Sequence, residues 1–580
     1  IDDSSITATD SHVLLQHNDA VGLLLTTIMK RPDDRTVVQN GMTGLRHITS
    51  GSSKEIAERC LELGAARILI RSMRRHLDVA QVQHEGCLLL LNIGTLSSNM
   101  WPQFVPFGGP QLLVDVIDAH HDSADVIAAA SHCLRAMLPT DDTFEGWDAL
   151  RRSVAADADD ADADGEDFAV VARVTQDLLN GAAPALLLSN LRTFCTDNAV
   201  CGHLFAILGF LVQVYNHDVD AWGGDFDAAP LRQAIVVALD AIKEHPTRLA
   251  LHEAALFYLS RACSAGPSVG TESDDLDPTA SKILATNKYF IREIVGVEDG
   301  ASTVLASMRR HLDSAAVQSC SCSLIRPLVL LSRAEGSDLL PQLKEMGITQ
   351  LVLGSMRCHT SSSEVQQSAM GALHTLCMAD TELLSEAVHD GDAFSSAAGA
   401  MRAHPNSKRV QSSGCCVLWV LCGEQSFITQ DAQGVHQSIR EVVWELGVIT
   451  TMRNHATSAS VSANAMGLLR RVIGLATEEQ LENAVFLVLG AILTHKSDAR
   501  VQGNACAALC SLMSASSANM KKIVDADGIK LVLESMAEHP TSEGCVRQAS
   551  LALEGFAADK ANLPAIVGER EDGGALPLLL

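Results

Sequence analysis

Aromatic residues and prolines are scarce in this sequence, and its apolar residues are mostly small or aliphatic. Phe, Trp and Tyr make up only 4% of the 580 residues and there are 16 prolines, although 47% of the chain is hydrophobic. Such a composition favours helices that pack through Ala, Leu and Val side chains. The chain is also longer than one ordinary compact domain, so we expect several domains or a repeat array.

Basic residues are too few for several kinds of partner. Lys and Arg number 43 against 70 Asp and Glu, which gives a formal net charge of −27 at pH 7. We do not expect nucleic acid as a partner, because its phosphates require a surplus of Lys and Arg. An anionic membrane surface is disfavoured for the same reason. We expect other proteins as partners, in particular basic ones or the members of a large complex.

Long apolar runs and recognisable targeting segments are also missing. The best run, LFAILGFLVQV near residue 210, has about half of the roughly 20 residues that a membrane-spanning helix needs. The first residues, IDDSSITATD, resemble neither a signal peptide nor a transit peptide. We therefore expect no direct membrane insertion and a cytoplasmic location, including cilia and cytoskeleton, with an organellar location after processing as the alternative. Because the chain starts without Met and stops at an apolar run, Leu578 to Leu580, we expect the natural protein to be processed or longer.

Signatures of metal and catalytic chemistry are absent from the sequence. The 16 cysteines are spread along the chain without two CxxC pairs, so neither a structural zinc site nor a disulfide framework is indicated, and a reducing compartment is expected. There is no P-loop, no G-x-G-x-x-G after a strand and no G-x-S-x-G. We expect no enzyme activity, with no catalytic residue, no cofactor and no metal.

One pattern is present many times along the chain. The phrase SMRRHLD begins at Ser72 and again at Ser307. If Met73 is taken as an anchor, His follows at +3, Val at +9, a small residue at +13 or +14, and large aliphatic residues at +17 and +20. The period is mostly about 40 to 51 residues. The other anchors are Met308, Met356, Met401, Met452 and Met536, Ile in the same slot at Ile117, Ile242 and Ile492, and looser copies at Ile28 and Leu191.

These offsets predict a unit of three helices. After the Val, apolar or small residues recur at the spacing of one face of a helix, and a second amphipathic helix ends near the anchor. A Gly commonly opens that second helix, after a short apolar segment. Stacked units would share one core, and we expect the small residues at +13 and +14 to let adjacent third helices approach closely. The opening glycines are Gly64, Gly109, Gly300, Gly347 and Gly528, and the cysteines at +14, expected to be buried and unreactive, are Cys87, Cys322, Cys415 and Cys506.

The unit resembles the armadillo repeat. The resemblance is carried by a Gly, a helix that ends in Met, a loop, and VQxxAxxxLxxL, most clearly from Gly528 to Ala557 and from Gly347 to Met378. The MxxH and VQxxGC pattern is similar to armadillo arrays of protists and of leucine-rich-repeat kinases. The resemblance implies an all-α fold, a right-handed α-solenoid of about eleven armadillo-type helical repeats.

Two stretches interrupt the period and suggest a division of the chain. We expect armadillo-type repeats over 1–140, an acidic low-complexity insert over 141–167, degenerate repeats over 168–263, a Gly/Pro/Ser/Asp loop insert over 264–293, and repeats over 294–580 that end in an incomplete unit. Asp160 to Gly165, DADADG, resembles the start of a calcium loop, but position twelve is Val171 rather than Glu. We interpret this stretch as a solvated acidic loop.

The recurrent His at +3 raises the question of a metal ladder. Neighbouring repeats lie about 10 Å apart, whereas zinc ligands lie about 2.1 Å from one ion. We expect each His instead to end its second helix and contact that helix's last carbonyls. The residues concerned are His76, His120, His245, His311, His359, His404, His455, His495 and His539.

The expected function is a non-enzymatic scaffold for protein–protein interaction. In armadillo proteins that hold extended peptides, such as importin-alpha and beta-catenin, an Asn ladder occupies the slot one place before the last aliphatic residue. This slot, +19, holds Asn92 but also Arg261 and Arg471, so we expect no regular clamp and assign these three as partner-binding candidates. The alternatives are a structural accessory subunit of a large ciliary or organellar assembly, and the armadillo region of a larger multidomain enzyme such as a repeat-containing kinase.

Overall fold

The computed structural model describes residues 20–51, 54–139, 166–179, 182–217, 228–263, 288–297, 299–335, 337–389, 392–423 and 442–567. This part of the chain contains helices and turns and no strand, as the all-α prediction requires. The calcium-like stretch Asp160 to Gly165, the terminal run Leu578 to Leu580, and residues 141–165 and 264–287 of the two inserts lie outside the described residues.

The helices form successive pairs in which a second helix ends near the anchor and a longer third helix follows. In order, the pairs are α2 (Ala20–Lys30) with α3 (Arg35–Thr49), α5 (Ala65–Arg75) with α6 (Ala80–Leu96), α8 (Gly109–Ala119) with α9 (Ala124–Ala136), α12 (Ala183–Thr193) with α13 (Asn198–His217), α14 (Ala229–Glu244) with α15 (Leu249–Cys263), α17 (Gly300–Arg310) with α18 (Ala315–Glu335), α20 (Ile348–Cys358) with α21 (Ser363–Ala379), α23 (Ala393–Ala403) with α24 (Lys408–Leu421), α27 (Thr451–Asn454) with α28 (Ala459–Val472), α29 (Glu478–Thr494) with α30 (Ala499–Ala515), and α32 (Gly528–Glu538) with α33 (Glu543–Ala557).

Further helices lie between these pairs or after the last one. They are α4 (Lys54–Glu62), α7 (Met100–Phe104) with the 3-10 turn η1 (Val105–Phe107), α11 (Glu166–Leu179), α19 (Leu339–Glu345), α22 (Thr381–His389), α31 (Ser517–Asp525) and α34 (Leu563–Val567) after η5 (Lys560–Asn562). Before α27 the chain forms a π-helix, η3 (Val442–Thr450), and after α28 a 3-10 turn, η4 (Ile473–Leu475).

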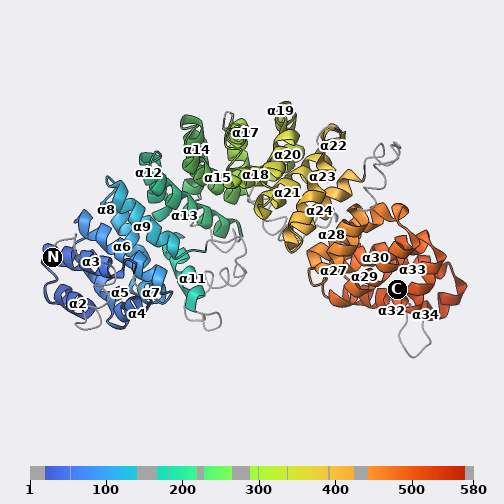
Figure 1. The fold of residues 1–580 in the computed structure, drawn as a ribbon, viewed down its shortest axis with the longest axis horizontal. Helices are drawn as coiled ribbons and strands as arrows, with labels where there is room; N and C mark the ends of the chain where they lie inside the picture. Colours follow the sequence, from blue (N-terminus) through green and yellow to red (C-terminus); the bar gives the residue numbers. More distant parts are fainter. Residues whose placement is uncertain are drawn as a thin grey trace. The chain divides into compact units, whose positions relative to one another are not determined.

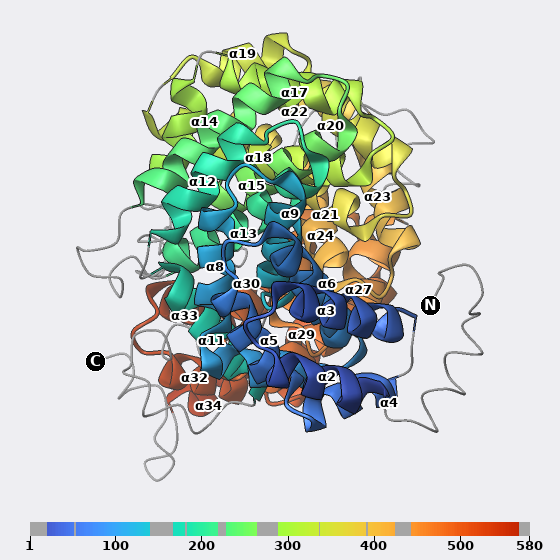
Figure 2. The same ribbon diagram turned by 90° about the vertical axis from the view of Figure 1, so that its left-hand side faces the viewer.

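The chain divides into two compact units, and each is a stack of repeats. Unit 1 comprises Ile1–Ser264 and Ala285–Val304, and unit 2 comprises Ala265–Leu284 and Leu305–Leu580. In unit 1, α3 packs on α6, α6 on α9, α9 on α13 and α13 on α15 (Figure 1). In unit 2, α18, α21, α24, α28, α30 and α33 pack in the same way, each on the next. Figure 2 shows α8, α12 and α14 of unit 1 in one layer and the third helices beside them in another.

The repeated apolar slots build the core of each stack. Met73 and Val82, the anchor and the first residue of the third-helix pattern, are both 0% exposed. Met401 and Val410 are equally buried in unit 2. Each such side chain contributes about 1.5–3 kcal/mol on burial, and since neighbouring repeats bury one another, the stability is shared along the stack.

The small residues at +13 have a different neighbour from the one expected. A Cβ on Gly86 would lie 2.7 Å from the Sδ atom of Met73, and one on Gly414 would lie 2.5 Å from that of Met401. These glycines therefore make room for the anchor of their own repeat and not for the adjacent third helix. Close approach of two third helices occurs instead at Gly503, where a Cβ would lie 3.3 Å from the Cα atom of Cys545.

Where a Gly stands at the turn before a second helix, it serves in one of two distinct ways. Gly64 and Gly347 have φ angles of 75° and 66° and precede the helix. Before α32 the left-handed residue is Asp527, with φ 59°, and Gly528 is already helical. Gly528 is needed for space, because a Cβ there would lie 2.4 Å from Cγ2 and 2.7 Å from the carbonyl oxygen of Ile523.

Two third helices are long and apolar enough to cross a membrane by length and composition alone. Among the described residues, these two are Asn198–Asn216 in α13 and Ala315–Glu335, which is α18. The apolar runs in the sequence did not predict a helix of this length. Their apolar windows are 61% and 56% buried inside the protein, and both helices pack between other helices of the stack. Both occupy the third-helix place of a repeat.

Candidate functional site: the third-helix surface

In five repeats a polar network connects the second helix to the third helix of the same repeat. The Gln after the Val, in slot +10, turns back and caps the second helix. The Nε2 atom of Gln411 donates to the carbonyl oxygens of Met401 at 2.8 Å and of His404 at 3.0 Å. The same two bonds are made by Gln83, Gln318, Gln366 and Gln502 in their repeats.

The same amides also join neighbouring repeats. The residue before the anchor carries a hydroxyl in several repeats, and it donates to the Gln of the preceding repeat. Ser355 donates to Oε1 of Gln318, Thr451 to that of Gln411 and Ser535 to that of Gln502. The S and the Q of the repeated phrase are therefore partners in adjacent repeats.

Gln83 lacks the bond to the next repeat, and the sequence explains why. Its Oε1 atom is buried and has no hydrogen-bond partner. In the following repeat the residue before the anchor Ile117 is Val116, which is 0% exposed and carries no donor. This buried acceptor therefore keeps its desolvation cost without a compensating bond.

The recurrent His does end the second helix, but its side chain contacts another repeat. His455 is the C-cap of α27, and its Nε2 atom lies 2.8 Å from the carbonyl oxygen of Pro405, in the loop of the preceding repeat. Since a carbonyl only accepts, Nε2 must carry the proton. The expected side-chain contact with the helix's own last carbonyls is wrong, because the ring binds the loop of the preceding repeat instead. Equivalent bonds are made by His76, His120, His359, His404, His495 and His539.

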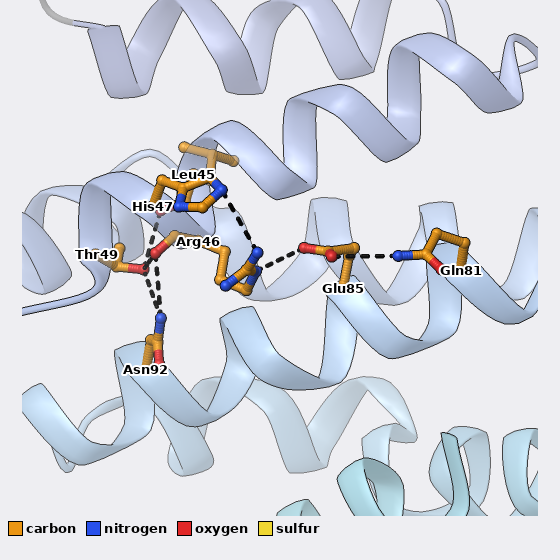
Figure 3. A network of polar contacts seen from close by, with 7 residues as sticks. All are labelled: Leu45, Arg46, His47, Thr49, Gln81, Glu85 and Asn92. Atoms are coloured by element: carbon orange, nitrogen blue, oxygen red, sulfur yellow. Dashed lines mark hydrogen bonds and ion pairs between the residues drawn. The ribbon is translucent and has the colours of Figure 1, made fainter. Parts of the chain in front are cut away.

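The partner-binding candidate Asn92 lies on the third-helix surface of unit 1, half-buried, and its amide is in use. The Nδ2 atom donates to the carbonyl oxygen of Arg46 at 3.2 Å and to Oγ1 of Thr49 at 3.3 Å, at the end of α3 (Figure 3). Beside it, Nε of Arg46 lies 2.7 Å from Oε2 of Glu85, which is 5% exposed. Asn92 thus joins two third helices.

The other two candidates are arginines that lie on aromatic rings. The guanidinium carbon of Arg261 is 4.8 Å from the ring centre of Phe257, on the same helix α15. That of Arg471, on α28, is 4.4 Å from the ring centre of Trp419, on α24. Such stacking holds the guanidinium in place while leaving its N–H donors at the edge. Arg261 is half-buried and Arg471 is exposed. Their role in binding a partner stays a prediction.

Slots +18 and +19 of the third helices, taken together, hold several Arg and His residues, a pattern that slot +19 alone does not show. Between α3 and α30 these two slots contain no Asp or Glu, although the whole chain carries 70. Arg46 is neutralised by Glu85, but within the described residues no carboxylate pairs with Arg135, Arg470 or Arg471. We call the basic residues in these slots the cation slots: Arg46, His47, Arg135, Arg261, Arg326, His374, Arg470 and Arg471.

The buried thiols are unsuited to nucleophilic chemistry. Burial raises the pKa of Cys322 and of Cys506 to about 12, and it raises the pKa of Cys415 as well. At neutral pH these residues are neutral thiols, as expected for small hydrophobic side chains in slot +14. Within the described residues no three His, Cys, Asp or Glu side chains are grouped to hold a metal ion.

Comparisons with known proteins agree with this architecture. Residues 237–474 match the family model described as LRRK2 ARM repeat. A chain from a structure of "a conserved phosphorylation switch" in the interaction between cadherin and beta-catenin aligns over 96% of this chain and 97% of its own, with 12% identity and a TM-score of 0.53. At this identity the likeness shows the fold alone. The described part of the chain therefore has the fold of an α-solenoid of the armadillo type, and residues 237–474 are similar in sequence to an armadillo-repeat family.

Two other solved structures align less well. The structure of SYS-1 covers 93% of this chain and 99% of its own, with 10% identity and a TM-score of 0.36. The Kap95p structure with RanGDP covers 98% and 71%, with 12% identity and a TM-score of 0.34. Scores this low add nothing to the assignment. No curated protein matches the sequence.

Proposed function

We propose that the chain is a non-enzymatic protein-interaction scaffold whose third-helix surface binds acidic segments of partner proteins. The observation that carries the proposal is the set of cation slots. From α3 to α30, slots +18 and +19 of the third helices contain no acidic residue, although the chain has a net charge of −27. The charge of the whole chain favours basic partners, but the local potential of the docking surface steers and selects the ligand. Stacked guanidinium groups such as that of Arg471 are ready donors for carboxylates.

The test compares acidic and basic peptides on the full chain by fluorescence anisotropy. We expect an oligo-Glu peptide to bind and an oligo-Lys peptide of equal length to bind far more weakly at this surface. Reversing the charge at Arg470 and Arg471 to Glu should weaken oligo-Glu binding by about tenfold or more, a change of at least about 1.4 kcal/mol. Arg453→Glu is the matched control, because Arg453 is an exposed residue on the second helix α27 of the same repeat.

The outcome that contradicts the proposal is equally direct. If the oligo-Lys peptide binds, the oligo-Glu peptide does not, and the Arg470/Arg471 variant behaves like the Arg453 variant, the partners are basic and dock elsewhere.

A second candidate is that the chain is the armadillo region of a larger protein, which the match of residues 237–474 to the LRRK2 ARM repeat supports. Mass spectrometry of the protein from its source cells tests this. Peptides that continue past Leu580 support it, and an intact mass equal to that of the printed sequence contradicts it.

A further inference from the structure

The second helix α29 of unit 2 exposes two large apolar side chains on one face. Phe486 is 57% exposed and Leu493 is 53% exposed, and because they lie two helical turns apart they point to the same side of the helix. Gly490, also exposed, lies between them. The opposite side of α29 is buried, and the helix packs on η3, α30, α31 and α32. We call Phe486, Gly490 and Leu493 the α29 face.

Most other repeats carry polar residues in the slots of Phe486 and Leu493. Leu493 directly follows the anchor Ile492, and in seven other repeats the residue in this slot is Arg or Lys. Phe486 lies six residues before the anchor, where six other repeats have Arg, Lys, Gln or Ser. The repeat architecture therefore requires an apolar residue in neither slot, and two of them on one exposed face indicate a contact surface. The basic residues after the anchor are Arg74, Arg192, Lys243, Arg309, Arg357, Arg402 and Arg453, and the polar residues six places before it are Arg67, Gln111, Ser302, Gln350, Ser395 and Lys530.

Opposite charges lie at the two ends of the α29 face. The first turn of α29 carries Glu478 and Glu479, and both are exposed. Lys496 follows the C-cap His495, its side chain is 56% exposed, and its Nζ atom lies 4.0 Å from Oε2 of Glu534. An exposed ion pair of this length contributes little, so Lys496 can also bind a carboxylate from outside. The face is therefore acidic where α29 begins, apolar in the middle and basic where α29 ends.

A surface with this order of charges is complementary to a copy of itself that runs in the opposite direction. Two α29 helices in antiparallel contact, centred near Gly490, place Phe486 of each copy against Leu493 of the other. Glu479 of each copy then lies at the end that carries Lys496 of the other, and a twofold axis relates the two pairs. Because Gly490 has no side chain, the two backbones can approach to the about 8–10 Å at which packed helices lie.

We propose that the α29 face binds a second copy of this chain, in a twofold homodimer whose α29 helices run antiparallel. A twofold contact uses the same patch on both copies, so one such face in each chain is sufficient. One helix pair buries less than the about 1,600 Å² of a standard interface, and we therefore expect a dissociation constant in the micromolar range. The contact uses a second helix, so it is independent of the third-helix surface that the proposed function concerns.

The experiment measures the mass of the full chain by sedimentation velocity at physiological ionic strength, which screens the repulsion between two chains of net charge −27. Between about 1 and 100 µM we expect the wild type to pass from monomer to dimer. The variant Phe486→Gln/Leu493→Arg should stay monomeric over this range. It should also stay folded, because other repeats carry Gln and Arg in these two slots. Leu551→Gln, at a residue of α33 that is 45% exposed, is the control and should dimerise like the wild type.

Charge reversal tests the direction of the two helices. Glu479→Lys and Lys496→Glu should each weaken the dimer by about tenfold, because each places like charges opposite one another at both ends of the contact. An equimolar mixture of these two variants should dimerise again, since every Lys at these positions then faces a Glu of the other copy.

Three results would overturn the proposal. The wild type could stay monomeric up to about 100 µM, which is above the expected dissociation constant. The variant Phe486→Gln/Leu493→Arg could dimerise like the wild type, which would place the contact elsewhere. The mixture of the two charge variants could stay monomeric, which would show that the helices do not run antiparallel. None of these results affects the acidic-segment scaffold, whose test depends on Arg470 and Arg471 of α28.

Discussion

At the scale of single residues, the amide of Gln318 serves three groups at once. It donates to the carbonyl oxygens of Met308 and His311 and accepts from Ser355 of the next repeat. Gln83 makes only the two donor bonds, and its buried oxygen is unpartnered. Replacing both by Met therefore gives a matched comparison, because the length of the side chain is kept.

We expect Gln318→Met to cost about 2–3 kcal/mol and Gln83→Met about 1 kcal/mol less, since each lost bond contributes about 1 kcal/mol and the second change also removes an unpaired buried acceptor. Hydrogen exchange of the amides in α17, α18 and α20, compared with those in α5 and α6, measures the local stability. Equal losses at the two sites would contradict the assignment of the inter-repeat bond.

A second prediction at this scale concerns the loss of stability that buried His374 causes at low pH. His374 on α21 is 7% exposed, its Nε2 atom has no hydrogen-bond partner, and burial and then the charge of Arg326 lower its pKa to about 4. The unfolded chain takes up this proton near its ordinary pKa of about 6.5. The unfolded state therefore binds more protons between those values, and stability falls as the pH drops from about 6.5 to 4.

We expect His374→Gln to lose less stability over this range than the wild type, by up to about 3 kcal/mol. Denaturant midpoints followed from neutral pH to acid measure the difference. His121→Gln, at an exposed histidine, is the control and should keep the wild-type profile. Parallel profiles for wild type and His374→Gln would show that this residue is not protonated more easily in the unfolded chain.

At the scale of the element, the turn before α32 depends on a Gly that has no space for a side chain. We expect Gly528→Ala to destabilise unit 2 by about 1–3 kcal/mol, because the new methyl group would contact the carbonyl and side chain of Ile523. A methyl group on Gly354, inside the second helix α20, would meet no atom within 4 Å apart from the backbone of its own helix. Gly354→Ala should instead stabilise by about 0.5–1 kcal/mol through helix propensity. Thermal unfolding of the two variants checks the opposite signs, and a loss in both would contradict the steric assignment.

A contact can be predicted from the sequence when the two groups that form it are close in the chain or are marked by a recurring side chain. The helix pairs can be predicted from the spacing of apolar residues within the repeat, since that period indicates which face of each helix is buried. The acceptor of His455 does not, because it is a backbone carbonyl 50 residues earlier and no side chain marks it. The cation slots could have been found by reading slot +18 beside +19. The stacked pair of His132 and His203 could not, because α9 and α13 are separated by an irregular stretch of sequence.

At the scale of the whole molecule, a net charge of −27 means that the chain repels itself. Salt shortens the range of this repulsion to a Debye length of about 8–10 Å at physiological ionic strength. We expect the thermal midpoint to rise by a few degrees between low and physiological KCl, while binding of an acidic peptide weakens over the same range. Calorimetry and anisotropy in the same buffers measure both, and a midpoint that falls with salt would show that favourable ion pairs, not repulsion, dominate.

The bond that the recurrent His makes to the preceding repeat, present in seven repeats, has a consequence for how such a chain can change over generations. Its acceptor is a backbone carbonyl, and the residues that supply it are Pro32, Leu77, Leu312, Thr360, Pro405, Ala456 and Lys496. Every amino acid has this oxygen, so the contact imposes no identity on the residue that provides it. A repeat can therefore be duplicated, deleted or exchanged with another without the loss of its connection to the next, and the array can change length by recombination of interchangeable modules.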